Sequence, residues 1–115
     1  MDTVRLAAWQ GRCVDGDVEA NLAAAHRAII EAGEQQADFL CLPEAFLSGY
    51  GSRALVERGA MSLEDARLAK LVAEAARRDL VLLVGLAERL SEGAIGNTVA
   101  IYAEGKRMAT TARRC

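Results

Sequence analysis

Apolar residues along the chain follow two different periods, and the changes between them predict the order of the elements. Short apolar runs of strand length occur at residues 4–10, 38–42, 80–86 and 97–102. Between them, apolar residues recur every three or four positions, which is typical of a helix with one buried face. The two helical stripes comprise Val18, Leu22, Ala25, Ile29 and Ala32, and then Leu63, Leu68, Leu71, Val72 and Ala75.

The residues before each stripe favour helix starts at two places. Asp17 can cap the first helix, and Ser62, with Asp65 three residues later, resembles a capping box that opens the second. Residues 45–60 contain three glycines and two serines, so we expect a loop there with room for a short helical turn.

The resulting order is strand, helix, strand, helix, strand, strand, which predicts an α/β layered domain. Helices at both crossovers indicate that the sheet begins with parallel strands. Residues 80–86 (LVLLVGL) are almost wholly apolar, as expected for a central strand buried on both faces. The dipeptide Glu104-Gly105 predicts a tight turn, after which residues 106–111 return as a hairpin partner.

Composition narrows the classes of protein that need to be considered. The chain has 115 residues, which suits one small domain or a piece of a larger one, and 52% hydrophobic with 26% charged residues is typical of a globular protein. A net charge of -2 offers no general attraction to nucleic acid or to anionic membrane, so we expect neither partner. The longest apolar run is far too short to span a bilayer, and no secretion signal is visible.

Cysteine and histidine usage argues against a metal site. Cys13, Cys41 and Cys115 are widely spaced, and His26, beside the first helical stripe, is the chain's one histidine, so we expect no zinc. Reduced thiols in the cytoplasm are the natural interpretation. We expect Cys13 in a loop and Cys41 buried within a strand.

The segment richest in potential chemistry is residues 40–50, LCLPEAFLSGY. It places Glu44 just past an apolar strand that Pro43 closes, and in α/β sheets ligands gather outside the carboxyl ends of strands. We expect a glutamate there to be half-desolvated, as suits a general base. From the residues alone, Glu44 is either such a base or the cap of a following turn.

An ordered set of segments resembles the nitrilase superfamily of carbon–nitrogen hydrolases. LPE-x-F-x-x-x-Y follows an opening VRLAAWQ strand and an Asn21-containing helix, and LVLLVGLAER and GNTVAIYAEGK come after it in the expected order. The resemblance implies the N-terminal part of a four-layer αββα sandwich of the nitrilase type, which associates as a homo-oligomer. It also implies hydrolysis of amides, N-carbamoyl compounds or, less favoured, nitriles, without metal or organic cofactor.

The resemblance assigns roles to individual residues. The family uses a Glu–Lys–Cys set, in which a thiolate attacks carbon, the glutamate handles the proton and the lysine stabilises the developing charge. Glu44 matches the glutamate, and Tyr50 either lines the pocket beside it or is a packed aromatic. The remaining matches are scaffold positions, namely a close-packed glycine, a buried or paired carboxylate and a side-chain cap on a turn: Gly85, Glu88, Asn97 and Thr98.

The resemblance is lost at about Thr110, which divides the chain into residues 1–110 and a divergent tail, residues 111–115. The family lysine would fall at Arg113, and arginine is not an equivalent replacement. Lys70 and Lys106 are expected to be solvated, and Cys115 has no following helix that could activate a thiol. Two hypotheses remain: an incomplete amidohydrolase that is inactive alone, or a noncatalytic α/β scaffold that associates with another subunit.

Overall fold

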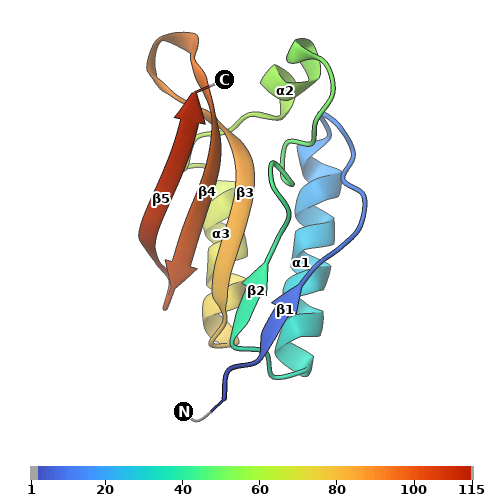
Figure 1. Cartoon of the computed structure of the whole chain (residues 1–115), viewed down its shortest axis with the longest axis vertical. Coiled ribbons are helices and arrows are strands. Elements are labelled where there is room, and N and C mark those ends of the chain that lie inside the picture. The colour runs from blue at the N-terminus through green and yellow to red at the C-terminus, as the bar shows by residue number, and fades with distance from the viewer. Residues whose placement is uncertain (1–2, 115) are drawn as a thin grey trace.

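The computed structural model describes residues 3–114 and contains one five-stranded sheet in the order β1-β2-β3-β4-β5 (Figure 1). The strands are β1 (Leu6–Ala8), β2 (Phe39–Cys41), β3 (Val81–Arg89), β4 (Ile95–Ala103) and β5 (Lys106–Arg114). The pairs β1–β2 and β2–β3 are parallel, whereas β3–β4 and β4–β5 are antiparallel. The predicted strand order, the parallel start, the central position of β3 and the final hairpin are all confirmed.

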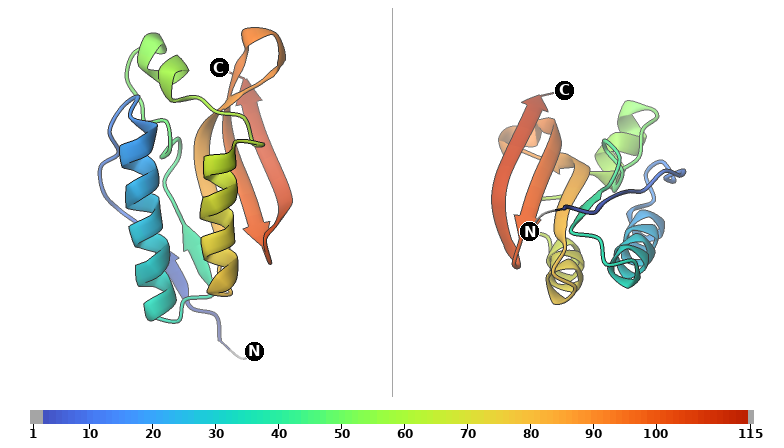
Figure 2. Two further views of the ribbon diagram at one scale, coloured as in Figure 1. Left: turned by 180° about the vertical axis from the view of Figure 1, so that it is seen from behind. Right: turned by 60° about the horizontal axis from the view of Figure 1, so that its bottom comes forward.

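The helices are α1 (Val18–Glu34), α2 (Arg53–Gly59) and α3 (Ala66–Arg77), with a 3₁₀ turn η1 (Ser91–Gly93) between β3 and β4. Figure 2 shows α1 and α3 lying side by side on the same face of the sheet. Both predicted apolar stripes face the sheet: all five positions of the first are buried, and of the second only Leu63 is partly exposed. Burial of these stripes is what attaches the helices to the sheet.

One predicted helix start needs correction, and the helical turn expected within residues 45–60 is a short helix. The second long helix is capped by Asp65, whose side chain accepts a hydrogen bond from the Arg67 N–H at 2.8 Å, whereas Ser62 accepts from Glu64 in a separate turn before it. Residues 45–60 contain a seven-residue helix, α2, because Ser52 supplies a cap by accepting from the Leu55 N–H. Asp17 caps α1 as predicted, accepting from Ala20.

The sheet face opposite α1 and α3 remains accessible over much of its area. Leu6 is 73% exposed, and Phe39, Leu83 and Ile101 are only partly buried. Cys41 lies on this face and is exposed, so the prediction that it is buried is wrong. Side chains alternate along a strand, and its neighbour Leu40, rather than Cys41, points toward the helices.

Candidate active site

Glu44 lies at the start of a turn that follows β2, and hydrogen bonds hold this segment against β3. The Leu42 N–H donates to the carbonyl of Leu83 at 2.9 Å, and the Leu47 N–H donates to the carbonyl of Gly85 at 3.2 Å. Further along, the Ala87 N–H donates to the Ser48 hydroxyl oxygen at 3.2 Å. The backbone around Glu44 is therefore fixed against the central strand, at the carboxyl end of β2.

Gly85 permits this close approach. A Cβ atom at position 85 would lie 2.4 Å from the Pro43 carbonyl oxygen and 2.7 Å from the Ala45 nitrogen, both of them backbone atoms. Ala45 itself has a positive φ of 53°, a conformation that costs energy for a residue with a side chain. The prediction of a close-packed strand glycine is confirmed, and the segment it packs against is the backbone of residues 43–45, which carries Glu44.

Two side chains contact Glu44. The Asn97 Nδ2 donates to Oε1 at 2.5 Å, and the Tyr50 hydroxyl donates to the Glu44 carbonyl oxygen at 2.8 Å and lies 3.4 Å from Oε2. Burial, the Glu44 charge and this hydrogen bond all raise the pKa of Tyr50, so the phenol stays protonated as a donor. Glu44 itself is exposed rather than half-desolvated, because it faces the accessible side of the sheet.

The prediction of a paired carboxylate holds for Glu88, whereas the prediction that Asn97 and Thr98 supply a side-chain cap on a turn is wrong. Both Asn97 and Thr98 lie inside β4 rather than capping a turn. Thr98 is buried and its hydroxyl donates to Glu88 at 2.8 Å, which confirms Glu88 as a paired carboxylate. Asn97 points to the other face and binds Glu44. Because side chains alternate along a strand, the pattern of residues 97–102 could have indicated that Asn97 and Thr98 lie on opposite faces.

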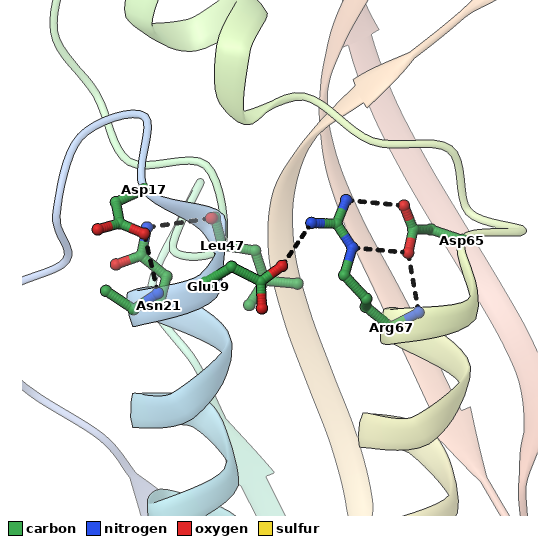
Figure 3. Close-up of polar contacts among 7 residues, drawn as sticks. Asp17, Glu19, Asn21, Leu47, Asp65 and Arg67 are labelled. Atoms are coloured by element: carbon green, nitrogen blue, oxygen red, sulfur yellow. Dashed lines mark hydrogen bonds and ion pairs between the residues drawn. The ribbon is translucent and has the colours of Figure 1, made fainter.

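A second loop, residues 11–17, supports the turn that carries Glu44. Asp15 Oδ1 accepts from the Tyr50 N–H at 2.7 Å. Asn21, which is 1% exposed, donates to the carbonyls of Val14 at 2.8 Å and Leu47 at 3.0 Å, and accepts from the Val14 N–H at 2.7 Å. Figure 3 shows Asn21 at the start of α1 with Leu47 beside it. No pattern along the chain indicates these tertiary contacts of Asp15 and Asn21, because they join residues that are far apart in sequence.

Arg113 is placed by strand pairing next to Asn97, the residue that binds Glu44. It lies opposite Asn97 in the β4–β5 ladder, so the two side chains share a face. Lys70 and Lys106 are exposed, as predicted. Cys13 lies in a loop, as predicted, and packs partly against the core, whereas Cys115 is outside the described residues.

Within residues 3–114 there is no cluster of three or more His, Cys, Asp or Glu residues that could hold a metal ion. Among the helices described, none is long and apolar enough to cross a membrane.

Comparison with known proteins identifies the family. The sequence profile of the carbon-nitrogen hydrolases matches residues 5–115. A curated protein of Pseudomonas protegens, "Hydrolase in pqqF 5'region", is 34% identical over 108 residues, which are 92% of this chain and 37% of that protein. The chain therefore spans well under half the length of this relative.

Solved structures agree. An amidase from Nesterenkonia sp. is 28% identical, with a TM-score of 0.79 over 96% of this chain and 42% of the amidase. A glutamine-dependent NAD(+) synthetase from Cytophaga hutchinsonii is 25% identical, with a TM-score of 0.78 over 97% of this chain and 19% of the synthetase. The predicted fold class, the N-terminal part of a nitrilase-type sandwich, is confirmed. The chain belongs to the carbon–nitrogen hydrolase family.

Proposed function

We propose that this chain provides the general base, Glu44, of an enzyme that hydrolyses amides or N-carbamoyl compounds, with nitriles less favoured. The observation that carries the proposal is the placement of the Glu44 carboxylate at the carboxyl end of β2, on a fixed backbone and in contact with Tyr50 and Asn97. Support for amides comes from the Nesterenkonia amidase, one mutant of which is solved in complex with butyramide.

In the proposed reaction, Glu44 takes the proton of a cysteine thiol, and the thiolate sulfur attacks the carbonyl carbon of the amide. The π electrons move to the carbonyl oxygen, whose negative charge a lysine ammonium stabilises. Collapse of this intermediate expels the amine, which takes the proton from Glu44. Glu44 then deprotonates water, which attacks the thioester and releases the acid and the thiol.

Neither a lysine nor a nucleophilic cysteine matches the family positions within residues 1–115. Arg113 occupies the lysine's place in the resemblance and shares a face with Asn97, but guanidinium is planar and bulkier than ammonium. We therefore assign only the base to this chain, with Tyr50 lining the pocket and residues 111–115 as a divergent tail. The complete enzyme is proposed to be a cytoplasmic homo-oligomer.

The proposal predicts that the 115-residue chain alone does not hydrolyse butyramide. Turnover that Cys115→Ala abolishes would contradict the assignment. In a hydrolase that contains this chain together with a lysine and a cysteine nucleophile, Glu44→Gln should lose activity and keep its fold. Glu57→Gln is the matched control, because Glu57 is exposed and pairs with Arg53 on α2. Full activity of Glu44→Gln would show that Glu44 is only a structural cap.

A second candidate is a noncatalytic scaffold that associates with another subunit. It is favoured by the exposure of all nine residues of β5, an edge strand of the sheet, and by Leu6 and Met108 at 73% and 64% exposed. Unpaired edges and exposed apolar faces are places where chains associate. The nucleotide sequence after codon 115 discriminates: a frame that encodes a lysine segment and a later cysteine favours the enzyme, and no such frame favours the scaffold.

A further inference from the structure

Asn97 and Thr98 are neighbours in β4 and bind different carboxylates on opposite faces of the sheet. Thr98 is buried on one face and donates to Glu88, whereas Asn97 lies on the accessible face and donates to Glu44. The Thr98–Glu88 pair belongs to the packed interior. The Asn97–Glu44 pair joins β4 to the carboxylate that the proposed function uses, so its role is separate from that of the interior pair.

The backbone contacts fix the position of Glu44 but not the direction of its side chain. Leu47 and Gly85 hold the turn by a backbone hydrogen bond, and position 85 has no side chain to separate the two segments. The Glu44 carboxylate is nonetheless carried on a flexible stem in an exposed position. Its direction is set by side-chain contacts, of which the 2.5 Å bond from Asn97 to Oε1 is shorter than the 3.4 Å contact from Tyr50 to Oε2.

We propose that Asn97 is a positioning residue, which binds Oε1 of Glu44 and thereby presents Oε2 as the proton-accepting oxygen. An amide N–H donates to a carboxylate and cannot take a proton from it, so Asn97 leaves the acceptor role to Oε2. The longer contact from Tyr50 leaves Oε2 available for a substrate or nucleophile. This inference rests on the proposed function of Glu44 as the base.

Asn97 also links the base to the last strand. It lies opposite Arg113, and directly opposed residues of antiparallel strands have side chains on the same face. The Arg113 side chain therefore lies on the same face of the sheet as Asn97, whose amide binds the Glu44 carboxylate. A change at Asn97 should alter Glu44 without requiring any movement of the helices on the other face.

The contact is testable in the 115-residue chain by NMR of the Asn97 side-chain amide. Glu44→Ala should move the Asn97 Hδ2 signals toward the values of a solvated amide, and Asn97→Ala should leave the Glu44 side-chain couplings averaged over rotamers. The control is Glu57→Ala, which removes an exposed carboxylate that pairs with Arg53 and should leave the Asn97 signals unmoved. Unchanged Asn97 signals in Glu44→Ala would overturn the inference.

Function is tested in a hydrolase that contains this chain with a lysine and a cysteine nucleophile. Asn97→Ala should lower kcat by about 10- to 100-fold and change KM less than about twofold. A misdirected base reduces stabilisation of the transition state and leaves substrate binding nearly unchanged. Asn97→Asp keeps the shape, loses the donor and places a second negative charge beside Glu44, so it should lower kcat at least as much. An unchanged kcat in Asn97→Ala, with Glu44→Gln inactive, would refute the role of Asn97 alone. Activity in Glu44→Gln would instead refute the proposed base.

Discussion

Replacing Asn21 with alanine should destabilise the protein more than removing the larger ionic cluster beside it. Asn21 makes three hydrogen bonds and is 1% exposed. The two bonds to Val14 are partly buried and contribute about 1 kcal/mol each, and the buried Leu47 carbonyl, left without its donor, costs about 2 kcal/mol. Alanine's better helix propensity offsets roughly 0.5 kcal/mol. We expect a net loss of about 2 to 4 kcal/mol.

Arg67→Ala is the matched comparison, since Figure 3 shows Arg67 joining Asp65 and Glu19 across the gap between α3 and α1. The Arg67 side chain makes three contacts of 2.9 to 3.1 Å with these carboxylates, but it is 43% exposed and Glu19 is 76% exposed. Exposed ion pairs contribute about 0 to 1 kcal/mol, because water and salt screen them. The Asp65 cap survives the change, since it accepts from the Arg67 backbone N–H.

Urea unfolding followed by circular dichroism measures both effects. With a slope of about 2 kcal/mol per M, Asn21→Ala should lower the midpoint by about 1 to 2 M and Arg67→Ala by less than about 0.5 M. A larger shift for Arg67→Ala than for Asn21→Ala would refute the argument that burial, rather than the number of bonds, sets the contribution. Asn21→Ala should also increase hydrogen exchange in residues 44–50, because Asn21 joins that turn to α1.

Three further predictions concern the site and its supports. Gly85→Ala should lower the free energy of unfolding in urea by about 1 to 3 kcal/mol, since its Cβ would meet backbone atoms of Pro43 and Ala45. Gly96→Ala should cost less, because the nearest atom is the Leu90 Cδ1 at 3.1 Å, at the end of a flexible side chain. Equal losses for the two variants would contradict this reasoning. Tyr102→Phe leaves Tyr50 as the one tyrosine, and ultraviolet titration of that variant should place the pKa of Tyr50 above 10.0. Adding Glu44→Gln should lower this pKa only in part, because burial is the larger cause. An unchanged pKa would exclude the Glu44 contact. The hydrogen bond from Arg67 lowers the pKa of Asp65 below its ordinary 3.8. The ionised carboxylate therefore stabilises the fold above pH 3.8, and this contribution is lost as the pH falls through the lowered pKa. Between pH 7 and pH 2.5 the free energy of unfolding should fall less steeply in Asp65→Asn than in the parent chain, and an unchanged pH dependence would refute the pairing.

Sequence patterns were sufficient for the two long helices and the order of the strands, because those patterns reflect local backbone geometry. A period of three to four residues located α1 and α3 and their buried faces, and apolar runs located the strands. The apolar run that Pro43 closes also predicted that Glu44 follows β2, whereas the close packing of Gly85 was implied by the family resemblance. The capping pattern placed the start of α3 at Ser62 because both Ser62 and Asp65 have capping side chains, and only the backbone path shows which one faces the free N–H groups.

The tertiary structure alone decided which of these residues meet. Cys41 is exposed because the accessible face of the sheet lies on its side, a fact that an apolar run cannot reveal. Glu44 and Asn97 are 53 residues apart, and Asn21 and Leu47 are 26 apart, so strand order and register bring them together. The sequence determined that a carboxylate follows a strand end, since this depends on neighbours along the chain. Which donors hold that carboxylate depends on sheet pairing, and pairing is a property of the folded chain.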